Sequence, residues 1–337
     1  MEKLLKEVFT KLIKKENLTT TECKSLVKSI FEKEEINDIQ LSSLLTLLNL
    51  KKESHIEILS FVNYLKKKAE IIKITGDLMD TCGTGGDNKN SFNFSTATSI
   101  LLSSFGVKIA KHGNRSVTSK SGSFDVLESL GINTDMKNSE QIKFFKKHGI
   151  CFLFAPKFHN SLKKVAKVRV SLPFKSIFNL LGPLLNPTKL KYQLLGVSNE
   201  HNLETHAKCL SQSNLKRAWV VYNKNGYDEL TTTSENFVIE VKNKKISKRM
   251  ILRPKDLGFK IRNENELKGG SPEENAFILK RVFEGETGAI RDNVIINTAA
   301  GLLVSEKIKN LKDGVKLVKE KIDSGMAYKK LISIIKN

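Results

Sequence analysis

The sequence predicts an α/β protein in which a mainly parallel central sheet is flanked by helices and accompanied by a small all-helical domain. Two observations support this fold class. From about residue 76, short apolar segments alternate with helical ones, an order typical of parallel sheets with helices on both faces. In residues 1–70 the apolar residues recur only at helical spacing, which indicates a separate helical domain.

The helices expected in this helical domain begin at polar capping residues. Thr19 and Glu22 have the spacing of a capping box, and Asn37 and Ser54 are typical N-caps. Each of these three helices carries an apolar face that must be buried. The faces are formed by Leu26, Val27, Ile30 and Phe31, by Ile39, Leu44, Leu45 and Leu48, and by Ile58, Leu59, Val62 and Leu65.

The domain boundaries follow the change of pattern along the chain. Residues 162–187 are helical in pattern with no strand partner nearby, so we expect them to join residues 1–70 in the helical domain. Residues 76–160 and 190–337 then form the α/β domain. No apolar run approaches the roughly 18 residues of a membrane span, so no membrane partner is expected.

Five strands are expected in the α/β domain, at "LMDTC", "VKIA", "CFLFAP", "YQLLGV" and "AWVVY". The stretch "FVIEVKNKKISKRMIL" predicts a β-hairpin, and the tail after about Ser271 is helical. Ligands of such sheets bind beyond the carboxyl ends of the strands. The glycine loop, the "KHGNR" loop and an Asp-Glu pair all follow expected strands, so they could meet at one edge.

The composition of the chain is that of an ordinary globular protein, with 337 residues, 39% hydrophobic and 28% charged. The net charge of +21 could attract nucleic acid. The lysines are spread along the chain without an RNA-binding motif, so we interpret them as solvated basic faces and expect no nucleic-acid partner. The amphipathic N-terminus contains Glu2 and Glu7, which favours a surface helix over a transit peptide.

The cysteines indicate a reducing compartment. They are far apart and form no C-x-x-C pair, which argues against a disulfide framework and against a zinc site. We therefore expect a cytoplasmic protein. The four positions are Cys23, Cys82, Cys151 and Cys209.

The glycine loop "GTGGD", residues 83–87, could hold an anion. Glycine permits positive φ and a close approach of the backbone, so that successive N–H groups can point at one ligand. The dinucleotide fingerprint fails because Asn88 stands where its third glycine is needed, and the P-loop pattern fails as well. The loop alone leaves an ordinary tight turn and an anion site both open.

The segment "NFST", residues 93–96, opens the helix expected from about Asn93 to Phe105. Its hydroxyl residues could simply cap that helix. The free N–H groups and the positive end of the helix dipole also favour phosphate. The glycine loop lies just upstream, which favours the anion site.

Two further segments carry groups suited to a polyphosphate. The loop "KHGNRSVTSKSGS", residues 111–123, combines basic and hydroxyl side chains with glycines, although it could also be a solvated loop. Asp228 and Glu229 follow the last expected parallel strand. Adjacent carboxylates are commonly surface charge, but beside a polyphosphate they could hold Mg²⁺.

Together these motifs resemble those of the anthranilate phosphoribosyltransferase (TrpD) family. The strings "GTGGD", "NFST", "KHGNR…SKSGS", "SIFNLLGPLLNP", "YDE" and "GGSPEENA" occur in that family's order and spacing, over nearly the whole chain. The resemblance implies a two-domain architecture like that of nucleoside phosphorylases and phosphoribosyltransferases. It implies transfer of phosphoribose from phosphoribosyl pyrophosphate to the amino group of anthranilate, with pyrophosphate released, as a step of tryptophan biosynthesis. It also implies Mg²⁺ as cofactor and a homodimer formed through the helical domain.

The resemblance also assigns roles to individual residues by their place in the motifs. The expected contacts of phosphoribosyl pyrophosphate are Gly83, Gly86, Asp87, Ser91, Asn93, Phe94, Ser95, Thr96, Lys111, His112, Gly113, Asn114, Arg115, Ser119 and Ser123. The expected contacts of anthranilate are Gly83, Asn114 and Arg169. The expected metal contacts are Ser95, Asp228 and Glu229.

No covalent nucleophile is expected, because the aniline nitrogen of anthranilate attacks the sugar. We interpret Cys82 as a small buried residue, and His112 and His159 as structural or hydrogen-bonding residues. Phe124 and Lys175-Ser176 depart from the family pattern, which leaves the shape of the anthranilate pocket open. Two rival functions remain, a pyrimidine nucleoside phosphorylase and a nucleic-acid-binding relative that has lost the transfer activity.

Overall fold

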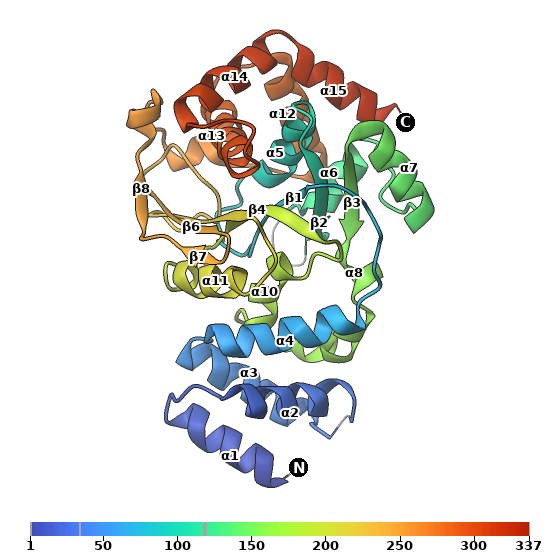
Figure 1. The fold of residues 1–337 in the computed structure, drawn as a ribbon, viewed down its shortest axis with the longest axis vertical. Coiled ribbons are helices and arrows are strands. Elements are labelled where there is room, and N and C mark those ends of the chain that lie inside the picture. Colours follow the sequence, from blue (N-terminus) through green and yellow to red (C-terminus); the bar gives the residue numbers. More distant parts are fainter. Residues whose placement is uncertain (1, 34, 117–119, 337) are drawn as a thin grey trace. The chain divides into compact units, whose positions relative to one another are not determined.

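The structure is a computed structural model that describes residues 2–33, 35–116 and 120–336 (Figure 1). The chain forms two compact units, and each combines segments that are distant in sequence. The first, helical unit contains the residues up to Ile71 together with Pro156–Pro187. The second, α/β unit contains Ile72–Ala155 and the residues from Thr188 onward.

Capping residues define the helices of the helical unit. The three expected N-caps are confirmed, because the side chains of Thr19, Asn37 and Ser54 each accept a hydrogen bond from the backbone N–H three residues later. Each also completes a capping box, with Glu22, Gln40 and Glu57 as the reciprocal partners. The helices are α1 (Glu2–Ile13), α2 (Thr20–Phe31), α3 (Asp38–Lys51), α4 (His55–Lys68), η1 (Asn160–Val165), α9 (Ala166–Ser171), α10 (Ile177–Leu181) and η2 (Gly182–Leu184), and α8 (Ala155–Phe158) joins the two units.

The apolar faces of these helices are buried as expected, except that Leu59 of α4 is only partly buried and Ile39 of α3 is exposed. Ile39 is 78% exposed, although its spacing had suggested the buried face of α3. It lies in the first turn of α3, and the buried side of that helix is formed by Leu41, Leu44, Leu45 and Leu48. Leu41 therefore takes the place that we had given to Ile39.

The α/β unit is built on a mixed sheet of eight strands with the order β3-β2-β1-β4-β5-β6-β7, and β8 pairs with β6. The pairs from β3 to β5 are parallel, while β6, β7 and β8 are antiparallel. The predicted fold class, a largely parallel sheet flanked by helices with an additional helical domain, is confirmed. The strands are β1 (Leu78–Gly83), β2 (Lys108–Gly113), β3 (Ile150–Phe154), β4 (Leu190–Gly196), β5 (Arg217–Asn223), β6 (Asn236–Lys242), β7 (Lys245–Ile246) and β8 (Met250–Leu252).

Helices cover both faces of this sheet. Figure 1 shows α5, α13 and α14 on one face and α11 on the other. The helix α5 is buried along almost its whole length, and it packs against α13 in the main core. The helices are α5 (Phe94–Ser103), α6 (Ser123–Ser129), α7 (Asn138–His148), α11 (His201–Ser211), η3 (Pro254–Leu257), η4 (Glu264–Leu267), α12 (Pro272–Glu284), α13 (Ala289–Val304), α14 (Leu311–Asp323) and α15 (Met326–Ile335).

The strand order places a topological switch point between β1 and β4. The chain runs from β1 outward to β2 and β3, and then returns to add β4 and β5 on the other side. Ligands of open α/β sheets bind at such a point, beyond the carboxyl ends of the strands. Across the described part of the chain, no helix has both the length and the apolar character needed to cross a bilayer.

Candidate active site

The glycine loop begins where β1 ends, at the switch point. Gly85 and Gly86 have φ values of +69° and +65°, so the left-handed conformation expected for this loop is confirmed at these two positions. Asn88 and Asn90 continue the tight course with φ values of +57° and +50°, which asparagine tolerates better than most residues. The loop thus turns tightly at four positions between residues 85 and 90.

Asp228 lies against this loop, and two glycines make room for it. Its Oδ2 accepts a hydrogen bond from the N–H of Gly85 at 2.7 Å. A Cβ added to Gly83 would lie 2.1 Å from that Oδ2, and one added to Gly196 would lie 1.5 Å from the carbonyl oxygen of Asp228. Gly83 and Gly196 are paired at the ends of β1 and β4. The sequence analysis did not single out Gly196, although a glycine ending a strand is a signal of close backbone approach.

Glu229 caps the start of α5. Its Oε1 accepts a hydrogen bond from the N–H of Ser95 at 3.1 Å. Asn93, the N-cap residue, makes no side-chain capping bond within the described residues. The simple capping alternative for "NFST" is therefore wrong, because a carboxylate from a distant segment takes the place of a local cap. Burial and the charge of Asp228 raise the pKa of Glu229 well above its ordinary value, and Lys111 opposes this shift.

Lys111 places a positive charge beneath the start of α5. Its side chain is 1% exposed, and its Nζ donates to the carbonyl oxygen of Thr81 at 2.8 Å and to the Oγ of Ser95 at 3.2 Å. Burial lowers the pKa of Lys111, while the charges of Asp80 and Glu229 raise it. The ammonium group is thus held by the carbonyl oxygen of Thr81 and hydrogen-bonds the side chain of Ser95.

The metal-contacting residues expected from the sequence lie close together. Ser95, Asp228 and Glu229 provide a hydroxyl and two carboxylates, and the bonds above connect all three to the glycine loop or to α5. In the described ranges no group of three or more His, Cys, Asp and Glu side chains could hold a metal ion alone. A set of two carboxylates with a hydroxyl fits Mg²⁺, which takes oxygen ligands and completes its shell with substrate phosphates and water.

Three other expected contacts of phosphoribosyl pyrophosphate lie in or just after the glycine loop: Asp87, Ser91 and Phe94. The Oδ1 of Asp87 accepts from the N–H of Lys89 at 3.0 Å, and Ser91 forms an isolated antiparallel bridge with Lys268. Phe94 is fully buried and packs edge-on against Phe92, so its side chain belongs to the core. The structure therefore indicates that Phe94 could meet a ligand only through its backbone.

Thr96 lies in the first turn of α5 and is fully buried. In the part of the chain that the structure describes, its Oγ1 has no hydrogen-bond partner. Gly86, the second left-handed glycine, lies one residue after Gly85, whose N–H is already bonded to Asp228.

The loop of residues 111–123, here called the hydroxyl-rich loop, turns back so that its last residue contacts residues near its beginning. The Oγ of Ser123 donates to the carbonyl oxygen of Asn114 at 3.2 Å, and a Cβ on Gly113 would lie 2.4 Å from that Oγ. The Oδ1 of Asn114 accepts from the N–H of Arg115 at 2.8 Å. The N–H of His112 donates to the fully buried Asp80 at 3.3 Å. The expected contact Ser119 lies outside the described residues.

Arg115 is engaged on the side of this loop that faces α6. Its Nη2 lies 2.7 Å from the Oε1 of Glu128, and its guanidinium lies 4.9 Å from the centre of the Phe154 ring. Phe154 also packs against Phe124, one of the departures from the family pattern. Glu128 thus engages the Nε and the Nη2 of Arg115.

Arg169 belongs to α9 of the helical unit, while Gly83 and Asn114 belong to the α/β unit. Its guanidinium lies 5.2 Å from the centre of the Phe178 ring, and burial lowers its pKa. Its role toward anthranilate stays a prediction.

Cys82, interpreted from the sequence as a buried residue, is only partly buried, unlike the other three cysteines. The Sγ of Cys82 accepts from Gln193 at 3.5 Å, and burial raises the pKa of its thiol well above the ordinary value. His159 is buried, with its Nε2 hydrogen-bonded to the carbonyl oxygen of Leu185 at 2.8 Å. A hydrogen-bonding role for His159 is therefore confirmed. All four cysteines are free thiols.

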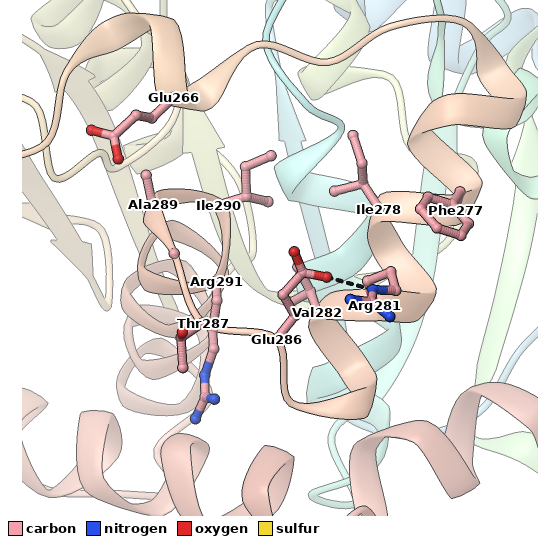
Figure 2. Close-up of a pocket in the computed structure, with 11 residues that line it drawn as sticks. Glu266, Phe277, Ile278, Arg281, Val282, Glu286, Thr287, Ala289, Ile290 and Arg291 are labelled. Carbon is pink, nitrogen blue, oxygen red and sulfur yellow. Dashed lines mark hydrogen bonds and ion pairs between the residues drawn. The ribbon is translucent and has the colours of Figure 1, made fainter.

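A separate hollow of about 270 Å³ lies between α12 and the start of α13 (Figure 2). Phe277, Ile278 and Ile290 contribute apolar lining, and Arg281 and Glu286 form an ion pair at 2.6 Å across it. None of the expected site residues that the structure describes lines this hollow. The chemistry-bearing groups of this protein are thus gathered at the switch point of the sheet.

A largely parallel sheet with a glycine loop, a helix start held by a distant carboxylate and an acidic pair at its switch point defines an enzyme that handles a phosphorylated sugar. The chain matches the Glycosyl transferase family, a/b domain, over residues 75–328, and the helical bundle domain of the same family over residues 6–69. Within that class, the chain belongs to the anthranilate phosphoribosyltransferase family.

Individual relatives support this membership along the full length of the chain. The anthranilate phosphoribosyltransferase of Petrotoga mobilis is 44% identical over 326 residues, which cover 96% of this chain and 94% of the relative. The crystal structure of the Thermus thermophilus enzyme has a TM-score of 0.88 with 34% identity and covers 98% of each chain. The Saccharomyces cerevisiae enzyme in complex with PRPP and Mg has a TM-score of 0.88 with 28% identity, covering 100% of this chain and 98% of its own.

Proposed function

We propose that this protein transfers phosphoribose from phosphoribosyl pyrophosphate to the amino group of anthranilate. The products are N-(5-phosphoribosyl)anthranilate and pyrophosphate, and the reaction belongs to tryptophan biosynthesis. The observation that carries this proposal is the convergence of Asp228 on the glycine loop, Glu229 on the start of α5 and Lys111 on Ser95. Such a site presents donors and a positive charge to a polyphosphate, and it leaves two carboxylates for a cation.

The α/β unit is the phosphoribosyl-pyrophosphate-binding domain of this proposal. Backbone N–H groups of the glycine loop donate to phosphate oxygens, and the N–H of Ser95 becomes available to them when Glu229 turns to the cation. Ser91, Ser95 and Ser123 supply hydroxyls around them. This arrangement stabilises the negative charge that gathers on pyrophosphate as the C1–O bond breaks.

Ser95, Asp228 and Glu229 would hold the cofactor Mg²⁺, with substrate phosphate oxygens completing its oxygen ligands. When bound, Mg²⁺ supplies neutralisation of the pyrophosphate leaving group. The buried ammonium of Lys111 hydrogen-bonds Ser95 and limits the negative charge that the two carboxylates bring to the site.

Anthranilate meets Gly83, Asn114 and Arg169 in this proposal. The planar guanidinium of Arg169 suits the carboxylate of anthranilate, and its face already lies over the Phe178 ring. The aniline nitrogen attacks C1 of a sugar that has become oxocarbenium-like, as in glycoside chemistry. No side chain acts as a covalent nucleophile.

The active protein is a cytoplasmic homodimer formed through the helical unit. That unit exposes large apolar side chains that a second copy could cover, with Ile13, Ile39, Leu50 and Val170 each at least 65% exposed. A molar mass of one chain in light scattering would reject the dimer.

One assay tests the function. Purified protein, Mg²⁺, phosphoribosyl pyrophosphate and anthranilate are mixed, and the loss of anthranilate fluorescence is followed. We expect a loss that depends on both substrates and that chelation of Mg²⁺ abolishes. No loss across a broad pH range would sink the proposal, and phosphorolysis of thymidine or uridine by the same protein would favour the nucleoside phosphorylase instead.

A further inference from the structure

Asn275 is a buried side chain of α12 that reaches the start of α5. It is 1% exposed, and its Nδ2 donates to the Oδ1 of Asn93 at 2.9 Å. The same Nδ2 donates to the carbonyl oxygen of Gly270 at 3.4 Å, and the Oδ1 accepts from the N–H of Gly270 at 2.9 Å. The bonds to Gly270 fix which way the amide faces, so its N–H is held toward Asn93.

The segment that precedes α12 runs beside the end of the glycine loop. The N–H of Gly269 donates to the carbonyl oxygen of Asn90 at 2.9 Å, and the N–H of Phe92 donates to the carbonyl oxygen of Leu267 at 3.0 Å. A Cβ on Gly269 would lie 2.5 Å from the Oδ1 of Asn275 and 3.0 Å from the Cα of Phe92. The glycine therefore permits the close approach that brings Asn275 to the loop.

The amide of Asn93 in turn bonds to the hydroxyl-rich loop. Its Oδ1 is occupied by Asn275, so its Nδ2 faces away and donates to the carbonyl oxygen of Ser121 at 3.3 Å. A chain of amide hydrogen bonds thus joins the segment before α12, the start of α5 and the loop of residues 111–123. These last two segments carry most of the groups proposed to bind phosphoribosyl pyrophosphate.

We propose that Asn275 is a positioning residue for phosphoribosyl pyrophosphate, which it serves by orienting Asn93. This inference rests on the proposed function. Asn93 lies two residues before Ser95, whose N–H meets Glu229 and whose Oγ meets Lys111. An amide turned the wrong way at Asn93 would displace the start of α5, whereas Arg169 lies in α9 of the helical unit and takes no part in this chain of amide bonds.

Asn275→Asp tests this with little change of volume. The new carboxylate cannot donate to Asn93, and a flipped Asn93 amide would turn its own oxygen toward the carbonyl oxygen of Ser121. We expect the Kd for phosphoribosyl pyrophosphate, measured by calorimetry with Mg²⁺, and its KM to rise about tenfold to a hundredfold. The KM for anthranilate should stay within about twofold. Unchanged affinity for phosphoribosyl pyrophosphate in the folded variant would overturn the proposal.

Gln141→Glu is the matched control. Gln141 is 3% exposed, lies in the same unit, and donates from Nε2 to the carbonyl oxygen of Phe152 at 2.8 Å. The Gln141→Glu variant therefore loses a comparable buried amide donor, but one that lies away from the glycine loop and the loop of residues 111–123. We expect a lower Tm with an unchanged Kd for phosphoribosyl pyrophosphate. An equal loss of affinity in this control would reduce Asn275 to a structural residue.

A double-mutant cycle tests whether Asn275 acts through Asn93. If it does, Asn93→Ala with Asn275→Ala loses no more affinity than Asn93→Ala alone. Additive losses would overturn the proposal, and this cycle also decides the matter if Asn275→Asp does not fold. Wild-type protein that binds phosphoribosyl pyrophosphate without turnover would reject the proposed function alone, and the affinity comparison would still decide the role of Asn275.

Discussion

Glu229 shows at the scale of a single residue how a binding site opposes stability. In the protein without metal, burial and the charge of Asp228 raise its pKa above the ordinary glutamate value of 4.5. The folded chain therefore keeps this proton to a higher pH than the unfolded chain does. The stability that the proton contributes is present below pH 4.5 and is lost as the pH rises through the raised pKa.

Glu229→Gln should separate the effect of Glu229 on stability from its proposed role as a metal ligand. The amide keeps an oxygen for the N–H of Ser95 but cannot ionise, so we expect a higher Tm than wild type at neutral pH without Mg²⁺. We also expect a flatter dependence of Tm on pH, and half-maximal activity only at Mg²⁺ concentrations about tenfold higher or more. The exposed Glu284→Gln is the control and should change none of these three quantities. An unchanged Mg²⁺ curve for Glu229→Gln would rule out metal ligation by this residue.

Arg169 is the residue whose proposed role is easiest to isolate kinetically. Arg169→Ala removes a fork for the anthranilate carboxylate and leaves every described contact of the glycine loop in place. We expect the KM for anthranilate to rise about tenfold or more, equivalent to about 1.4 kcal/mol. The KM for phosphoribosyl pyrophosphate should change far less, and Arg169→Lys should recover only part of the loss. Equal effects on the two KM values would reject the assigned role.

At the scale of the element, the ends of β1 and β4 are shaped around Asp228. Gly196→Ala would place a Cβ 1.5 Å from the carbonyl oxygen of Asp228, a backbone atom that cannot move aside alone. We expect a loss of about 1–3 kcal/mol in the free energy of unfolding, measured by urea denaturation. The variant should also need a higher Mg²⁺ concentration for half-maximal activity, because displacement of Asp228 disturbs the acidic pair.

Gly182→Ala is the comparison for this prediction. A Cβ at Gly182 meets nothing within 4 Å, and its backbone is right-handed helical. Gly182 precedes Pro183, and a Cβ before proline disfavours the right-handed region, so the substitution should lower the free energy of unfolding, but by less than Gly196→Ala does. Similar losses in both variants would show that the clash with Asp228 is relieved by local movement.

The elements of the site could be predicted because their signals are local in sequence. The left-handed Gly85 and Gly86 follow from a glycine-rich stretch, and the helix start at Phe94 follows from polar residues before an apolar run. The placement of the loops at one edge follows from the alternation of strands and helices. Each of these inferences uses fewer than about ten consecutive residues or a general rule of sheet topology.

Most contacts that complete the site could not be predicted from local patterns, because they join distant segments, and the meeting of Ser95 with Glu229 was expected only from the family resemblance. Asn275 meets Asn93 across 182 residues, and Glu229 meets Ser95 across 134 residues. Arg115 pairs with Glu128 only because α6 turns back beside the loop. The exposure of Ile39 likewise depends on which side of α3 faces the rest of its unit. Periodicity identifies an apolar stripe but does not decide its edge.

At the scale of the whole molecule, the net charge of +21 is high enough to attract nucleic acid. Acidic side chains neutralise part of the basic surface, as where Glu306 lies 2.5 Å from the Nζ of Lys216. Other lysines remain exposed, among them Lys244, Lys245 and Lys248 on the hairpin that follows β6. Charges spread in this way attract polyanions at long range without providing base contacts.

The expected consequence is binding of duplex DNA that is weak, independent of sequence and steep in salt. Fluorescence anisotropy with a labelled duplex should show the affinity falling by at least about a hundredfold between about 50 and about 200 mM salt. Because the substrate site lies at the switch point and the exposed hairpin lysines at the edge of the sheet, saturating duplex should leave the KM for phosphoribosyl pyrophosphate unchanged at the higher salt. Replacing Lys244, Lys245 and Lys248 by glutamine should flatten the salt dependence without altering turnover. DNA binding that persists at the higher salt and displaces phosphoribosyl pyrophosphate would instead support the nucleic-acid-binding alternative, since both anions would then share one site.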